Sequence, residues 1–114
     1  MKIEKFEELI SWQKAINVTV LIYRIFKNNK DYGFRDQIQR AAVSISNNIA
    51  EGFERHSRKE LKQHLYIAKG SCGESRSMLY IAKELKYISN EEFNILYDSL
   101  TEISRLLAGF IKKL

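Results

Sequence analysis

Hydrophobic residues recur along most of the chain at the three- and four-residue spacing of an α-helix. The regularity is greatest between about Asn90 and Lys113, where the large apolar residues are Phe93, Leu96, Leu100, Ile103, Leu107, Phe110 and Leu114. Such a stripe is typical of a helix that packs along one seam of a bundle. Similar patterns predict three earlier helices, over about residues 8 or 11 to 28, 34 to 53 and 58 to 86.

The breaks between these helices are short and carry turn and capping residues. Polar residues and a glycine fill positions 28–33, NNKDYG, which predicts a turn. Ser57 with Glu60, and Ser89 with Glu92, each place a hydroxyl three residues before a carboxylate, the spacing of a helix-capping box. Long amphipathic helices joined by short connections predict one all-α domain over residues 1–114, an antiparallel up-and-down four-helix bundle.

Composition favours such a domain and limits where it would reside. The chain has 114 residues, 45% of them hydrophobic, and no proline, so we expect long helices and a core that needs no metal or disulfide. Its single cysteine, Cys72, cannot form an internal disulfide. Charged or amide residues interrupt every apolar run near the N-terminus, unlike a signal peptide or a membrane span, and we expect a cytoplasmic protein.

The second helix separates apolar residues from small polar ones. Its apolar side consists of Ile38, Ala42, Ile45, Ile49 and Phe53, and Gly52 is well placed to end or bend the helix. Over a quarter turn away lies a second stripe: Gln37, Arg40, Ala41, Ser44, Asn48, Glu51 and Arg55. Short amides and hydroxyls suit close approach by another helix or by a second subunit. A solvated face with Glu51 and Arg55 as an ion pair is the alternative.

The third helix carries more apolar surface than one neighbour can cover. One stripe comprises Leu61, Leu65, Ala68, Cys72, Ser75, Leu79 and Ala82. A second stripe, about a third of a turn away, comprises Ile67, Met78, Ile81 and Leu85, with Glu74 among them. The first helix is likewise apolar on more than one side. Two apolar sides need two neighbours, which predicts a homo-oligomer.

Positive charge is concentrated around the third helix. The net charge is +5, and residues 55–86 alone contain eight basic and three acidic residues, which accounts for the whole excess. One face of this helix consists of Lys62, Tyr66, Lys69, Gly73, Arg76, Tyr80 and Lys83, and Arg55, Arg58 and Lys59 precede it. Cations can neutralise phosphates and phenol rings can stack on unpaired bases, so this face is the predicted nucleic-acid-binding site. A solvated or interfacial face whose long side chains cover apolar surface is the alternative.

Motifs for catalysis or metal binding are weak or absent. His56, Glu60 and His64 are four residues apart, but His56 precedes the expected helix start and so leaves the face that a metal would need. Residues 70–73, GSCG, match the GxxG of an RNA-binding loop but lie inside a continuous helical pattern. We expect no catalytic residue, no metal site and no cofactor, and we expect Cys72 to be a small core residue.

Several short motifs resemble a known bacterial family. They are QIQRAAVSI at residues 37–45, NIAEG at residues 48–52, and Gly70 and Ser71 followed by Glu74. Together they resemble the signature of the 23S rRNA intervening-sequence proteins, over nearly the whole chain. The resemblance implies an up-and-down bundle that assembles into a ring-like homopentamer and a link to genes inserted in large-subunit rRNA. It also implies kinship with accessory proteins of diversity-generating retroelements, which are basic pentamers that engage nucleic acid and a reverse transcriptase. It implies no catalytic residue.

The leading hypothesis is therefore a non-enzymatic homo-oligomer that binds RNA or another nucleic acid through the basic and aromatic face of the third helix. A scaffold that binds only proteins is the alternative, and an RNA-processing nuclease is a third class for which the sequence offers no site. Subunit contacts or family-motif positions are predicted at Arg40, Ser44, Asn48, Glu51, Gly52, Ile67, Glu74, Met78 and Ile81.

Overall fold

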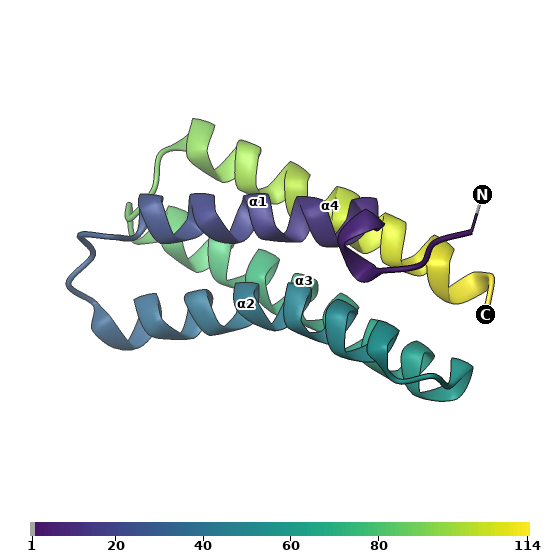
Figure 1. Ribbon diagram of the computed structural model, residues 1–114. Coiled ribbons are helices and arrows are strands. Elements are labelled where there is room, and N and C mark those ends of the chain that lie inside the picture. The colour runs from purple at the N-terminus through teal and green to yellow at the C-terminus, as the bar shows by residue number, and fades with distance from the viewer. Residues whose placement is uncertain (1) are drawn as a thin grey trace.

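The computed structural model describes residues 2–114, which form a bundle of four long helices (Figure 1). A short 3-10 helix, η1 (Phe6–Glu8), leads into α1 (Ile10–Ile25), and α2 (Tyr32–Glu54), α3 (Arg58–Glu84) and α4 (Asn90–Lys112) follow. No strand occurs in this described part of the chain. The prediction of an all-α chain with four helices is confirmed.

Hydroxyl side chains cap the last two helices. Ser89 forms the predicted capping box, because its Oγ accepts a hydrogen bond from Glu92 N at 3.0 Å while Glu92 Oε1 accepts one from Ser89 N at 2.9 Å. Ser57 Oγ likewise accepts from Glu60 N, at 3.3 Å. The Glu60 carboxylate, however, binds Arg55 at 3.3 Å and does not complete the second box.

The start of α2 depends on a residue that the sequence pattern did not single out. Asp31 Oδ1 accepts a hydrogen bond from Phe34 N at 3.3 Å, and the helix begins at Tyr32, two residues before the expected start. Tyr87, which follows α3, donates from its hydroxyl to Asp31 Oδ2 at 2.7 Å. This hydrogen bond raises the pKa of Tyr87, so the phenol remains a neutral donor that ties the end of α3 to the start of α2.

The predicted apolar stripes meet in one core. Its fully buried side chains include Ile22, Ile38, Ile45, Ile49, Leu65, Leu79, Leu96, Leu100, Ile103 and Leu107. Each helix packs against two neighbours, α1 and α3 both lying between α2 and α4. The contact between α2 and α3 is the most extensive, and the two chain ends lie at the same end of the bundle (Figure 1). As a result, α3 presents one side to α2 and another to α4.

Part of the second apolar stripe of α3 stays on the surface. Ile67, Ile81 and Leu85 are 52%, 49% and 52% exposed, whereas Met78 is only 6% exposed and belongs to the core. Met78 follows Ser71 by seven residues, which places both on the side of α3 that α2 covers. The prediction of a subunit contact at Met78 is thereby corrected, because this side chain is buried within its own chain. None of the helices in residues 2–114 combines the length and the hydropathy needed to cross a membrane.

Candidate nucleic-acid interface

The basic and aromatic face predicted for the third helix lies along the contact between α3 and α4. We name this contact the α3–α4 seam. It comprises Lys62, Tyr66, Lys69, Gly73, Arg76, Tyr80 and Lys83 of α3 with Phe93, Tyr97, Thr101, Ala108 and Lys112 of α4. The end of α3 meets the start of α4, and the start of α3 meets the end of α4. The four cations of α3 are seven residues apart, which is about 10 Å along the helix axis.

One end of the seam is hollow. A space of about 470 Å³ is lined by Lys62, Tyr66, Lys69, Ala108, Ile111 and Lys112. Its three ammonium groups and one phenol hydroxyl can all donate hydrogen bonds to an anion, and no carboxylate is among the lining residues. The arrangement suits the phosphate groups of a polyanion.

Aromatic rings fill the other end of the seam. The Tyr80 ring centroid lies 5.1 Å from that of Phe93 and 5.6 Å from that of Tyr97. The Lys83 ammonium is 4.6 Å from the Phe93 centroid, a cation–π distance. The neighbouring Tyr97 hydroxyl raises the pKa of Tyr80, so this phenol adds no negative charge to the face. Tyr80 is 52% exposed and retains ring surface on which a base could stack.

The seam cations have no acidic partners. Within residues 2–114, no carboxylate lies at ion-pair distance from Lys62, Lys69, Arg76, Lys83 or Lys112. An unpaired cation keeps its full attraction for a ligand, whereas one already bound to a carboxylate does not. The seam is therefore a continuous band of available positive charge.

The other three predicted nucleic-acid-binding residues lie outside the seam. Arg55 follows α2 and is held by Glu51 at 2.7 Å and by Glu60 at 3.3 Å. Arg58 and Lys59 are exposed in the first turn of α3. The structure thus groups six of the nine predicted residues on one seam and engages Arg55 in an internal ion-pair network.

Sequence reasoning missed the residues that α4 contributes. Tyr97, Thr101, Ala108 and Lys112 recur in steps of four and seven residues, so they lie on one side of the helix. None of them is acidic, although α4 carries several acidic residues elsewhere. A helix side free of carboxylates is the signal that could have identified the partner of the basic face.

The small polar stripe of α2 faces α3 within the same chain. Ser44 Oγ accepts hydrogen bonds from Ser71 Oγ at 2.9 Å and from Asn48 Nδ2 at 3.0 Å. Asn48 Oδ1 lies 3.0 Å from His64 Nδ1. Because the Asn48 amide nitrogen donates to Ser44, its oxygen is the acceptor and His64 Nδ1–H is the donor. We name this contact the α2–α3 seam.

Gly52 allows the two helices of this seam to approach closely. A Cβ at Gly52 would lie 2.6 Å from His64 Cβ and 3.3 Å from Leu61 Cδ1. Since His64 Cβ is fixed to the α3 backbone, no side-chain rotation could relieve that clash. Ser44, Asn48 and Gly52 therefore take part in helix pairing inside the chain, one of the alternatives that the sequence left open.

The remaining predicted contact residues lie at or near the surface. Glu51 accepts a hydrogen bond from Arg55, which lowers the pKa of the Glu51 carboxyl. Glu74 accepts one from Gln37 Nε2 at 3.3 Å. Arg40 is exposed, as are Ile67 and Ile81 on the outer side of α3.

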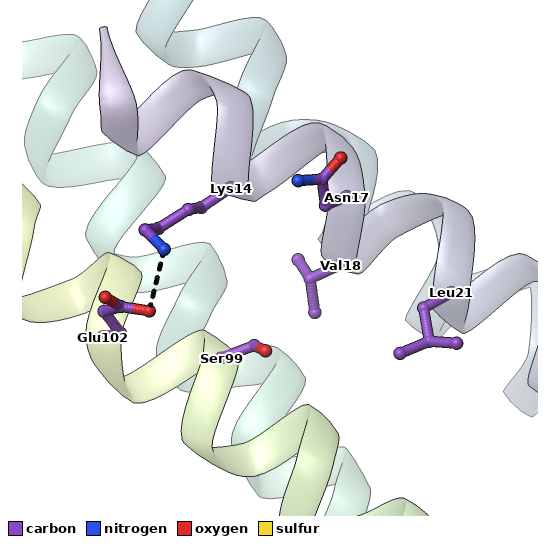
Figure 2. A pocket seen from close by; sticks show the side chains of 6 residues that line it. All are labelled: Lys14, Asn17, Val18, Leu21, Ser99 and Glu102. Atoms are coloured by element: carbon purple, nitrogen blue, oxygen red, sulfur yellow. Dashed lines mark ion pairs between the residues drawn. The ribbon is translucent and has the colours of Figure 1, made fainter.

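A smaller hollow between α1 and α4 offers little binding chemistry (Figure 2). It measures about 160 Å³. Its single cation, Lys14, is already paired with Glu102 at 3.3 Å, and Figure 2 shows this ion pair at one edge of the hollow. The site therefore has no free charge for an anionic ligand.

A larger and mainly apolar hollow lies near the end of the bundle where the two chain ends meet. It measures about 570 Å³ and is lined by Ile3, Leu9, Phe53, Leu61, Arg105, Leu106, Gly109, Phe110 and Lys113. Its walls suit an apolar group more than a row of phosphates. It does not share a residue with the α3–α4 seam.

Neither a cluster of metal-ligating side chains nor an exposed thiol occurs in the part of the chain that the structure describes. In residues 2–114, no three His, Cys, Asp or Glu side chains gather as metal ligands would. Cys72 is fully buried in the core, and burial raises the pKa of its thiol to about 12. A thiol of this kind is a poor nucleophile at neutral pH.

Comparison with known proteins places the chain in a family. Residues 7–109 match the 23S rRNA-intervening sequence protein family. The chain is similar to a crystal structure from Bacteroides thetaiotaomicron, a protein of unknown function from the S23 ribosomal protein family. That similarity has a TM-score of 0.85 and 28% sequence identity, covering 90% of this chain and 99% of the other. No curated protein shows a significant match. Because the family match spans nearly all of the bundle, this chain belongs to the 23S rRNA-intervening sequence protein family.

Proposed function

We propose that this protein is a non-enzymatic, homo-oligomeric helical bundle that binds RNA, or another nucleic acid, through the α3–α4 seam. The observation that carries the proposal is the band of unpaired cations and half-exposed tyrosines with no carboxylate at ion-pair distance. Cations gain affinity for a polyanion by releasing its counterions, and aromatic rings stack on unpaired bases. The family name refers to intervening sequences of 23S rRNA, which makes single-stranded or looped RNA the first ligand to test.

Self-association is the second part of the proposal. The subunit is an antiparallel up-and-down bundle, and the family resemblance implies a ring of five copies. Exposed Ile67 and Ile81 on α3, Leu85 directly after α3, and Val20 and Tyr23 on α1 support contact with a second copy. A polyanion bound across several subunits would meet the same basic seam repeatedly, which raises its effective affinity.

Salt dependence provides the decisive test. Fluorescence anisotropy with a labelled 16-nucleotide oligouridylate should show affinity that falls linearly in log–log form as salt is added. Changing Lys62, Lys69 and Lys112 together to Gln should weaken binding and reduce the slope by about 2, because each removed phosphate contact contributes about 0.7 for a single strand. The matched control changes the exposed residues Lys5, Lys27 and Lys30 to Gln, with the same loss of charge away from the seam. Equal losses for both variants would contradict the assignment to this seam.

The scaffold alternative predicts a different outcome from the same preparation. If the wild-type protein fails to bind the oligouridylate at about 50 mM salt, where such contacts are strongest, the nucleic-acid proposal fails and a protein-binding role takes its place.

Light scattering tests self-association by measuring the molar mass of the protein in solution. A value near the 13.4 kDa of one chain would contradict the homo-oligomer.

A further inference from the structure

Two buried polar atoms of the α3–α4 seam have no hydrogen-bond partner in residues 2–114. They are Nε of Arg76 on α3 and Oγ1 of Thr101 on α4. Most buried polar groups in folded proteins are paired, because a lone donor or acceptor loses the hydrogen bonds that it made to water. The two residues as wholes are only partly buried, so a small movement of their side chains can bring both atoms into contact with a ligand at the surface.

Both atoms belong to the middle of the seam. The Arg76 guanidinium carbon is 6.0 Å from the Tyr97 ring centroid, and Thr101 follows Tyr97 by one helical turn on the same side of α4. On α3, Gly73 precedes Arg76 by one turn, and a Cβ placed there would approach only Arg76 Nη2, at 3.9 Å. The glycine thus leaves room beside the guanidinium that a larger residue would fill.

We propose that a phosphate group of the bound nucleic-acid backbone accepts hydrogen bonds from Arg76 Nε–H and from the Thr101 hydroxyl beside Gly73. This inference rests on the proposed function and names the residues that orient the ligand. A guanidinium presents its N–H donors in a rigid fork that matches phosphate oxygens, which an ammonium group cannot do. Lys69 and Lys83, each seven residues from Arg76, supply charge about 10 Å to either side for adjoining parts of the strand.

Substituting Thr101 separates a ligand contact from a merely structural hydroxyl. Thr101→Val keeps the β-branched shape and removes the hydroxyl, so the thermal unfolding midpoint should stay the same or rise. Affinity for the labelled oligouridylate should nevertheless fall about three- to tenfold, the range for one hydrogen bond. The slope of affinity against salt should not change, because no charge is lost. Thr101→Ser restores the hydroxyl and should restore most of the affinity.

Substituting Arg76 tests the other donor. Arg76→Lys keeps the charge, removes the Nε–H group, and should also weaken binding by at least about threefold. Combined with Thr101→Val, the loss should be smaller than the product of the two single losses, because both side chains act on one phosphate. The control is Arg24→Lys, an exposed arginine on α1, which should bind as wild type does. An oligouridylate with uncharged methylphosphonate linkages should no longer distinguish Thr101→Val from wild type.

The outcomes separate this inference from the proposed function. If Thr101→Val and Arg76→Lys bind like wild type while the triple lysine variant loses binding, then no phosphate of the ligand pairs with the two atoms. In that case the inference is wrong and the proposed function stands. If the wild-type protein does not bind the oligouridylate, the proposed function fails and this inference fails with it.

Discussion

The two seams of α3 satisfy their polar groups in opposite ways. Towards α2, the hydroxyl, amide and imidazole groups of Ser44, Asn48 and His64 are hydrogen bonded to one another. Towards α4, five cations have no carboxylate at ion-pair distance in residues 2–114, and one end of the seam is hollow. The space beside the glycines differs between the two seams as well. A Cβ at Gly52 would lie 2.6 Å from His64 Cβ on α3, whereas the nearest atom to a Cβ at Gly73 would be Arg76 Nη2 at 3.9 Å.

The difference separates polar residues that pair helices from polar residues that remain available to a ligand. Arg55 and Arg76 illustrate it, because sequence reasoning assigned both to nucleic-acid binding. The Arg55 guanidinium already forms ion pairs with the carboxylates of Glu51 and Glu60, so less of its positive charge is available to a ligand. Arg76 lies beside the Tyr97 ring of α4, and its Nε is buried without a hydrogen-bond partner. The type of residue is the same, and its neighbours decide its role.

Replacing Gly52 by Ala should have the largest effect on the α2–α3 seam. The added methyl group would require α2 and α3 to move apart, and overpacking of this kind costs about 1–3 kcal/mol of unfolding free energy. Urea denaturation measures the loss. The control is Gly70→Ala, at an exposed position of α3 where no neighbouring atom lies within 4 Å of the new Cβ. The unfolding free energy of this variant should rise by up to about 1 kcal/mol. A Gly52→Ala protein as stable as wild type would show that the seam is not closely packed.

Replacing Asn48 by Ala should have a smaller effect on the same seam. The substitution removes the hydrogen bonds to Ser44 and leaves His64 Nδ1 without its acceptor, so we expect a loss of about 1 kcal/mol. Asn47→Ala, at the exposed adjacent position, should be neutral within about 0.5 kcal/mol. Neither variant should change the affinity for RNA. Weaker RNA binding by Asn48→Ala alone would mean that the two seams are not independent.

Most of the fold could be predicted because its causes are local. The stripe that includes Leu96, Leu100 and Leu107 fixes one face of α4, and Ser89 with Glu92 fixes its start. Met78 was misplaced because a helical wheel shows which side a residue occupies but not how far a neighbouring helix extends around it. Close approach at Gly52 and Ser71 brings α2 near enough to cover that side.

Of the two helices that form the candidate site, the sequence predicted the residues of α3, which carries most of the charge, and not those of α4. Spacing alone places Lys62, Lys69 and Arg76 on one face of α3, and the structure brings them to a common seam. Thr101 and Lys112 belong to the same seam but are separated from them in sequence, and neither is unusual for a helix surface. Their role depends on which side of α4 faces α3, which is a long-range property.

Replacing Gly73 by Ala should give the smallest effect, of opposite sign to that at Gly52. Alanine favours the helical conformation over glycine by up to about 1 kcal/mol, and the new Cβ would make only an ordinary contact with Arg76 Nη2 at 3.9 Å. The unfolding free energy should therefore rise, as it should for Gly70→Ala. RNA binding distinguishes the two variants, because only the methyl group at position 73 occupies space beside the Arg76 guanidinium. Weaker binding by Gly73→Ala at higher stability would show that this space is kept open for a ligand, and a loss of stability would show that the α3–α4 seam is as tightly closed as the α2–α3 seam.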